Sequence, residues 1–184
     1  MGLPSADELE AARARPLPDV LPGPDDPPFR VLFCGINPGL VSAATGHHFA
    51  RPGNRFWPVL HEAGFTPRLL RPAEQGELPG WGMGITNMAA RPTARADELT
   101  DAELVDGGRI LHDLVERYVP TWLAVVGMGA YRTAFGDRAA IVGAQEPAIG
   151  PTRIWVLPNP SGLNAHYPKH RLVEEYARLR AAAL

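Results

Sequence analysis

Three short apolar segments, each closed by a glycine or a proline, constrain the fold of this 184-residue chain most strongly. They span residues 29–34, 122–126 and 154–157, and a weaker fourth segment lies at residues 84–88. Near-continuous apolar runs of this length are typical of parallel strands that are buried on both faces of a sheet. The four segments therefore predict a central sheet that other elements cover on both sides.

Helical patterns lie between these segments. Apolar residues recur at helical spacing over residues 54–63, 100–119 and 168–184, and Thr100 with Glu103 forms a capping box at the start of the second pattern. Alternation of strands with helices predicts a three-layer α/β/α fold around a mostly parallel, four-stranded sheet. Such sheets bind ligands at the carboxyl ends of their strands, so we expect the chemistry in the loops that follow the four strands.

The N-terminal region has a different pattern. A capping box predicts a short helix over residues 6–15, and the six prolines between residues 16 and 28 exclude regular structure there. We therefore expect residues 1–28 to form a short helix and a proline-rich extension that leads into, or wraps around, a single domain at residues 29–184.

Composition limits the class of protein. The only cysteine, Cys34, excludes an internal disulfide and a cysteine-ligated metal site, and no pattern implies a metal or a cofactor. No apolar run approaches the ~18 residues that a membrane span needs, and the N-terminus lacks the pattern of a secretion signal. We expect a cytoplasmic protein that acts as a monomer without contacting a membrane.

The distribution of charged residues along the chain gives a different indication from the net charge. A net charge of −2 argues weakly against a polyanionic partner. However, residues 27–61, 78–96 and 147–173 contain no Asp or Glu, although they hold Arg30, Arg51, Arg55, Arg91, Arg95, Arg153, Lys169 and Arg171. A fold that gathers these windows on one face would present a positive surface to phosphates. The alternative is that buried strands simply carry few charges.

Polar and aromatic residues follow the first two strands. The first strand opens into Gly35–Gly39, where Pro38 keeps Asn37 out of the helical region and presents a short amide at the strand end. Asn37 could bond a substrate, hold a water or stabilise a turn. Phe49 could stack on a planar base or belong to the core. Asn87, at the end of the second strand, is a candidate base-binding residue by its position.

The loop after the last strand, Pro158–Asn164, contains two prolines and presents Leu163 at its tip. An apolar side chain on a stiff loop can act as a wedge between stacked bases, although it could equally fold back onto the core. Ser161, Gly162 and the basic run that includes Lys169 offer hydroxyl, backbone N–H and cationic groups to phosphates.

Five motifs in the chain resemble a known family. They occur in the family's order: Gly35-Ile36-Asn37-Pro38-Gly39, Asn54-Arg55-Phe56-Trp57, Arg91-Pro92-Thr93, Gly107-Gly108-Arg109 and Asn159-Pro160-Ser161-Gly162-Leu163. On these motifs the chain from about Arg30 to Arg180 resembles the mismatch-specific uracil-DNA glycosylases. That family is similar to the thymine-DNA glycosylases within the uracil-DNA glycosylase superfamily.

The resemblance implies a monofunctional DNA glycosylase of base excision repair, with double-stranded DNA containing uracil or mismatches as its partner. In it, Asn37 positions the attacking water and Phe49 stacks on the extruded base, while backbone N–H groups around Ile36 hold the departing base anion. Strict uracil glycosylases carry Asp and Tyr where this chain has Asn37 and Gly39. Loss of that tyrosine implies a pocket that also accepts thymine or ethenocytosine opposite guanine.

The expected DNA-binding residues are Arg91, Asn159, Ser161, Gly162, Leu163, Asn164 and Lys169. Asp97 is a lesser catalytic candidate: it follows the second strand and could assist the water, or it could be a solvated acid ahead of the next helix. Lys169 is the only lysine and lies in the phosphate-side loop, so a Schiff-base lyase step is not expected.

The sequence is also compatible with two other classes of function. The same wedge and stacking ring would serve a non-catalytic protein that binds damaged or mispaired DNA. An enzyme of free nucleotides would instead use the glycines at residues 80–84 and 127–129 as phosphate loops, but neither stretch fits a known phosphate-binding pattern.

Overall fold

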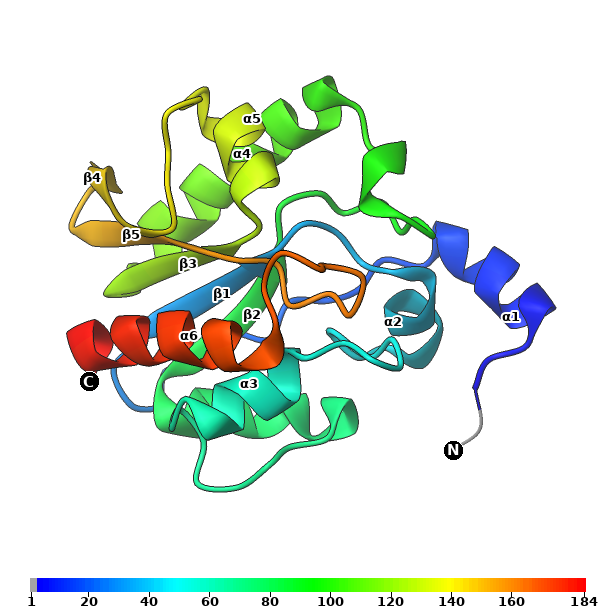
Figure 1. Cartoon of the computed structure of the whole chain (residues 1–184), viewed down its shortest axis with the longest axis horizontal. Helices are drawn as coiled ribbons and strands as arrows, with labels where there is room; N and C mark the ends of the chain where they lie inside the picture. The colour runs from blue at the N-terminus through cyan, green and yellow to red at the C-terminus, as the bar shows by residue number, and fades with distance from the viewer. Residues whose placement is uncertain (1–2) are drawn as a thin grey trace.

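A five-stranded sheet crosses the middle of the protein (Figure 1), as seen in a computed structural model that describes residues 3–184. Its order is β2-β1-β3-β5-β4, with β4 antiparallel to β5 and the other neighbours parallel. The strands are β1 (Val31–Gly35), β2 (Met83–Asn87), β3 (Trp122–Val126), β4 (Gly143–Ile149) and β5 (Thr152–Leu157). Because β2 and β3 lie on opposite sides of β1, the carboxyl ends of β1 and β3 form the switch point at which such sheets bind ligands.

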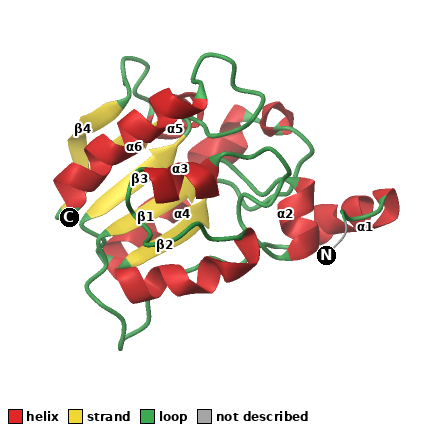
Figure 2. Cartoon of the chain, turned by 60° about the horizontal axis from the view of Figure 1, so that its bottom comes forward, coloured by secondary structure: helices red, strands yellow, loops and turns green. Residues whose placement is uncertain are grey.

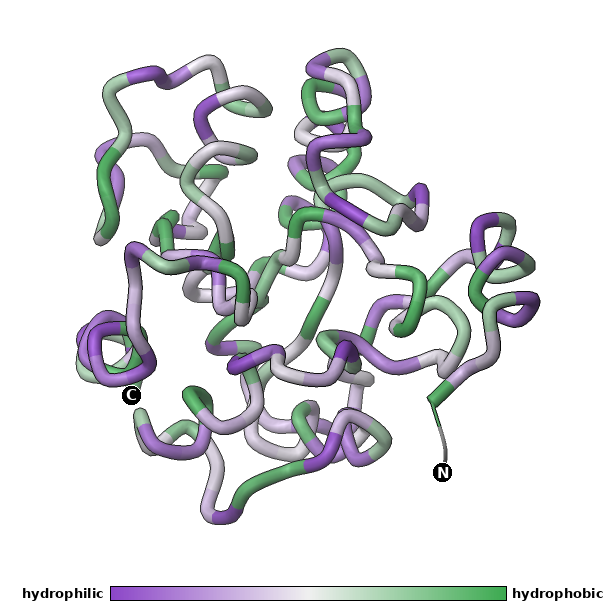
Figure 3. Tube along the Cα trace, turned by 45° about the vertical axis from the view of Figure 1, so that its right-hand side comes forward, coloured by the Kyte–Doolittle hydropathy of each residue, from purple (hydrophilic) through white to green (hydrophobic). Residues whose placement is uncertain are grey.

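Helices cover both faces of the sheet, as the sequence predicts (Figure 2). Every residue of β1 and β3 is buried, and alternate residues face two different core clusters. One cluster joins the sheet to α3 (Phe56–Glu62) and α6 (Lys169–Ala183), and the other joins it to α4 (Asp101–Tyr118) and α5 (Met128–Phe135). Figure 3 shows apolar segments in the middle of the trace and hydrophilic stretches toward its outside.

The capping boxes lie where the sequence places them. Oγ1 of Thr100 accepts from the backbone N–H of Glu103 (3.2 Å) at the start of α4, and Ser5 caps α1 (Ala6–Ala11) in the same way. Short 3-10 helices follow at Ala12–Ala14, Pro72–Trp81 and Ala96–Glu98. No helix among residues 3–184 is both long enough and apolar enough to cross a membrane.

The expected count of four strands is wrong, because β4 adds a fifth at the edge. β4 has few apolar residues and is mostly exposed, so it lacks the pattern that marks the buried strands. Two helices are also absent from the sequence prediction, α2 (Leu40–Thr45) and α5. Both are short and have no side-chain N-cap, so the signals used to predict helix starts are missing.

The proline-rich segment packs along the edge of the sheet beside β2. Val20 and Ile85 exchange two backbone hydrogen bonds of 2.8 Å, and the hydroxyl of Thr86 donates to Oδ1 of Asp19 (2.7 Å). Gly84 permits this approach, since a Cβ on Gly84 would lie 2.6 Å from the carbonyl oxygen of Val20. The segment therefore wraps the domain and covers an otherwise open strand edge.

Candidate active site

A cavity of about 130 Å³ lies at the carboxyl ends of the four parallel strands. Ile36–Gly39 follow β1, Asn87 ends β2, Val126 ends β3 and Asn159 follows β5, and all of them line it. The loops in which the sequence predicts chemistry thus meet at one place. The volume is well below the ~300–1,000 Å³ of sites for drug-sized ligands, so the cavity can hold only a small group.

The carboxamide of Asn37 is fixed in the wall of this cavity. Its Nδ2 donates to the carbonyl of Arg91 (2.8 Å), to Oγ1 of Thr93 (2.7 Å) and, at 3.3 Å, to the carbonyl of Pro38. Carbonyls only accept, and the Thr93 hydroxyl already donates to the carbonyl of Arg95 (2.7 Å), so the amide has one permitted orientation. That orientation leaves Oδ1 of Asn37 without a donor among residues 3–184 and available to a ligand or a water.

Thr93 is a site residue that the reasoning from single residues missed. It is buried, and its backbone also joins the loop after β2 to the loop after β1: its N–H donates to the carbonyl of Pro38 (3.1 Å), and its carbonyl accepts from Leu40 (3.2 Å). Its place in the motif Arg91-Pro92-Thr93 was the only sign of its importance. A lone threonine in a loop carries no such signal.

Phe49 forms a rigid aromatic wall. Its φ of 54° is unusual for a residue with a side chain, and its ring stacks on Phe56 with centroids 3.9 Å apart. Strained backbone of this kind costs about 1–3 kcal/mol and persists only where the surroundings impose it. Gly35 makes room for the wall, since a Cβ there would lie 3.3 Å from the Phe49 ring and 2.6 Å from Oδ1 of Asn87.

His48, beside Phe49, is a buried residue that also lines the cavity. Its Nε2 lies 3.0 Å from the carbonyl oxygen of Pro18, and its Nδ1 lies 3.3 Å from Nδ2 of Asn87. Burial lowers the pKa of His48, although the bond to Pro18 and the charge of Asp19 act in the opposite direction. No pattern in the sequence points to His48, because histidine is common in both cores and loops.

The loop after β5 presents Leu163 to solvent with 72% of its surface exposed. Arg55 holds this loop by its backbone: the guanidinium donates to the carbonyls of Tyr167 (2.7 Å), Asn164 (3.1 Å), Pro160 (3.3 Å) and Ser161. A loop that is held in this way keeps its apolar tip extended. Leu163 therefore does not fold back onto the core.

The polar residues of this loop bond within it. Oδ1 of Asn159 accepts from the N–H of Ser161 (2.9 Å), and Nδ2 of Asn164 donates to the carbonyl of Asn159 (3.0 Å). Gly162 lies against the loop before α3, where a Cβ would approach the carbonyl oxygen of Gly53 to 2.6 Å. The side chains of Asn159 and Asn164 thus shape the loop.

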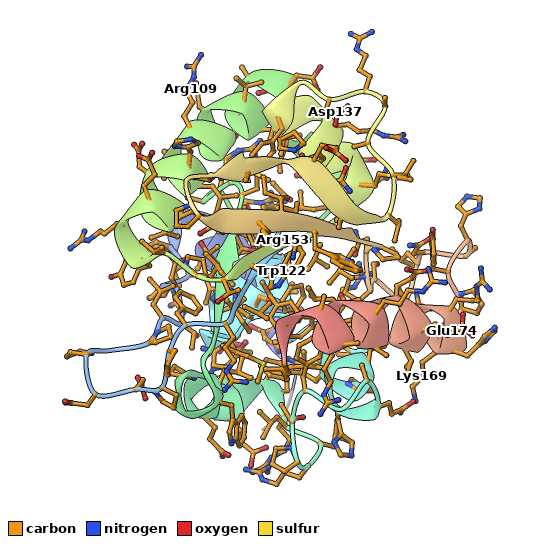
Figure 4. All side chains as sticks on the ribbon, turned by 90° about the vertical axis from the view of Figure 1, so that its left-hand side faces the viewer. Arg109, Trp122, Asp137, Arg153, Lys169 and Glu174 are labelled. Carbon is orange, nitrogen blue, oxygen red and sulfur yellow. The ribbon has the colours of Figure 1, made fainter. Side chains whose placement is uncertain are left out.

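Two cations expected to contact DNA are already paired in the free protein. The guanidinium of Arg91 bonds both oxygens of Glu103 (2.6 and 3.0 Å) and lowers the pKa of that carboxyl to about 2, so the pair persists at neutral pH. Lys169, on the surface of α6 (Figure 4), pairs with Glu62. Arg51 differs, since no carboxylate among residues 3–184 lies within 4.0 Å of its guanidinium. It lines both the cavity beside Asn37 and a second hollow that Leu163 also lines.

No carboxylate of the described chain lines the main cavity. Asp97 pairs with Arg95 in an exposed position, outside the lining. Within residues 3–184, the one cluster of metal-ligating side chains, His112 with Asp113 and Glu116, is exposed on α4 and shares no residue with the cavity.

Among the glycines that could have formed phosphate loops, Gly82 and Gly127 have packing roles. A Cβ on Gly82 would collide with the carbonyl of Pro28, and one on Gly127 would lie 3.0 Å from the side chain of Ile36. Close approach of protein atoms therefore explains both glycines without a bound phosphate.

Fold and site define an α/β protein with a small cavity at the carboxyl ends of its parallel strands, beside an exposed apolar loop tip. The family model described as "Uracil DNA glycosylase superfamily" matches residues 22–181, and the chain belongs to this superfamily. Its members are DNA glycosylases, hydrolases that act on uracil in DNA.

Proposed function

We propose that the protein is a monofunctional glycosylase of the mismatch-specific type, which hydrolyses the N-glycosidic bond of uracil flipped out of double-stranded DNA. The observation that carries the proposal is the Asn37 carboxamide, whose nitrogen is held by protein acceptors and whose oxygen remains available in a cavity without a carboxylate. An amide oxygen can orient a water through a hydrogen bond, but it cannot accept a proton as a carboxylate does.

The reaction then depends on the leaving group. Departure of uracil as an anion leaves an oxocarbenium-like sugar, which a water held by Asn37 captures at C1′. The water forms a bond to C1′ and loses one proton to solvent, while the electrons of the broken N-glycosidic bond remain with the base anion. Backbone N–H groups around Ile36 stabilise this anion. Without a positioned base the enzyme forgoes about 10²–10⁴ in rate and is slow.

Base flipping needs a side chain that fills the gap in the duplex and a surface that receives the extruded base. Leu163 and the ring of Phe49 suit these two roles. Leu163 would fill the gap that the extruded nucleotide leaves in the duplex, while Phe49, supported by Phe56, stacks on the base. Mispaired bases flip at lower cost than paired ones, which favours uracil and thymine opposite guanine. Arg91 and Lys169 are paired with Glu103 and Glu62, so a phosphate would either compete with these carboxylates or bind the N–H groups that the pairs leave unused.

Gly39 is expected to set the breadth of substrates. It lines the cavity, its φ of −70° suits any residue, and a Cβ there would meet no atom within 4 Å. Gly39→Tyr should therefore fold normally and narrow the pocket beside C5 of the base. We expect release of thymine and ethenocytosine opposite guanine to fall at least ~10-fold more than release of uracil. Equal losses on all three bases would contradict a steric role for this position.

Arg51 is expected to bind a phosphate beside the flipped nucleotide. Arg51→Gln should weaken binding to duplexes of any sequence and should reduce the salt dependence of binding, the slope of log K against log[salt], by about 1. Arg109→Gln is the matched control, because Arg109 is an exposed arginine of α4 already paired with Asp106. A slope that is unchanged in Arg51→Gln would remove this residue from the DNA interface.

A substrate panel tests the proposal against its main alternative. One oligonucleotide should carry uracil, thymine or ethenocytosine opposite guanine, uracil opposite adenine, or uracil in a single strand. A glycosylase leaves alkali-labile abasic sites, with uracil opposite guanine expected to react fastest. A protein that only binds damaged DNA would use the same cavity and loop tip but would leave every strand intact.

A further inference from the structure

The buried imidazole of His48 takes no part in the proposed hydrolysis, although it forms part of the cavity wall. Neither of its nitrogens is free to act as a base, since one contacts the carbonyl of Pro18 and the other contacts the amide of Asn87. What these two contacts do to Asn87 follows from the direction of each hydrogen bond.

The carbonyl of Pro18 can only accept, so Nε2 of His48 carries the proton. In the neutral ring Nδ1 is then a lone-pair acceptor, and it must receive its hydrogen bond from Nδ2 of Asn87. The amide of Asn87 is thereby oriented: its nitrogen faces His48, and its oxygen lies on the side of Gly35, at the strand end that opens into the cavity.

A fixed amide distinguishes two bases. Oδ1 of Asn87 can accept from N3–H of uracil while the second N–H of Nδ2 donates to O4. Cytosine has an acceptor at N3 and a donor at N4, so it would need the amide reversed. Reversal would place Oδ1 of Asn87 against the lone pair of Nδ1 of His48, which is repulsive.

We propose that His48, held by Pro18 as the Nε2–H tautomer, is a positioning residue that orients Asn87 so that the cavity accepts uracil and rejects cytosine. This inference rests on the proposed function. It also gives the N-terminal segment a role, because Asp19 and Val20 hold Pro18 in place through Thr86 and Ile85.

Protonation of His48 removes the orienting contact, since Nδ1 then becomes a donor and faces another donor. Among the described titratable groups, Asp19 favours the charged ring and His47 opposes it, while burial is the largest influence and lowers the pKa. The ring is therefore neutral at pH 7. Uracil release is expected to fall only at acidic pH, below the ordinary range of histidine.

Two substitutions separate orientation from packing. His48→Phe keeps a ring but removes the acceptor, whereas His48→Asn places an oxygen near the position of Nδ1. The probes are duplexes with 2′-fluoro-deoxyuridine or 2′-fluoro-deoxycytidine opposite an abasic analogue, which resist cleavage and leave neither base paired. We expect His48→Phe to lower the preference for uracil over cytosine about tenfold, the size of one misdirected hydrogen bond, and His48→Asn to retain it within about twofold. His112→Gln, on exposed α4, is the control.

A spectroscopic measurement on the unmodified chain covers the case in which a variant fails to fold. Ring ¹⁵N chemical shifts should show that His48 is protonated at Nε2 at pH 7, and an Nδ1–H tautomer would overturn the inference. A folded His48→Phe protein that keeps the wild-type preference for uracil over cytosine would also overturn it. Failure of the proposed function looks different: the wild-type protein would then release no uracil at all.

Discussion

Asn37→Ala is expected to slow single-turnover release of uracil from a G·U duplex by about 10²–10³-fold, because the variant loses the fixed amide oxygen that we propose holds the attacking water. Binding to an uncleavable 2′-fluoro-deoxyuridine duplex should change by less than about twofold, since the side chain is not needed to hold the DNA. A rate within twofold of the wild type would show that Asn37 does not position the nucleophile.

Asn37→Asp is the informative companion variant. A carboxylate would normally supply a general base, but here it would face the carbonyl oxygens of Arg91 and Pro38, which now interact with an N–H group. These acceptors should raise the pKa of the new carboxyl and favour its protonated form. We therefore expect no gain over the wild-type rate at pH 7. A gain of 100-fold would mean that the loop rearranges around the carboxylate.

Arg55→Ala is expected to release the Leu163 loop, because four carbonyls lose their shared donor. Hydrogen bonds from a charged group are worth about 1.5–3 kcal/mol each and are not additive, so we expect the free energy of unfolding to fall by about 2–4 kcal/mol. Uracil release should fall at least ~10-fold, since a mobile Leu163 fills the duplex poorly. Urea denaturation and single-turnover rates measure the two effects.

Arg55→Lys and Leu163→Ala are the controls for this prediction. Lysine keeps the charge but cannot reach four diverging carbonyls, so it should recover little. Leu163→Ala should slow uracil release without loss of stability, because its side chain is 72% exposed. Full activity in a folded Arg55→Ala protein would show that catalysis does not depend on the conformation of the Leu163 loop.

The parts of the fold that could be predicted from sequence are those with strong local patterns. Apolar runs predicted the parallel strands. Because ligands bind at the carboxyl ends of such strands, the same runs also predicted where the cavity lies. The polar edge strand β4 and the short helices α2 and α5 were missed because they lack such patterns and form only where the rest of the fold supports them.

Some residues of the candidate site could be predicted from the sequence and others could not. Asn37, Gly39 and Asn87 lie at or just after strand ends, where the sequence predicts the site, and the family resemblance adds roles for Asn37 and Gly39. Phe49 lies further along the chain and was predicted from its aromatic ring and the same resemblance. All four residues line the cavity. Thr93 and His48 contact the amides of Asn37 and Asn87, and nothing in a sequence records which way an amide must point. The pairing of Arg91 with Glu103 and of Lys169 with Glu62 was likewise hidden, because it depends on elements that meet only in the folded chain.

Base release from a single G·U duplex tests the central claim most directly. With protein in excess, free uracil, alkali-labile sites and strand breaks formed without alkali should be measured over the same time course. Hydrolysis directed by Asn37 predicts free uracil and alkali-labile sites in equal amounts, with no breaks before alkali. A duplex that is bound while its uracil remains attached would contradict the claim.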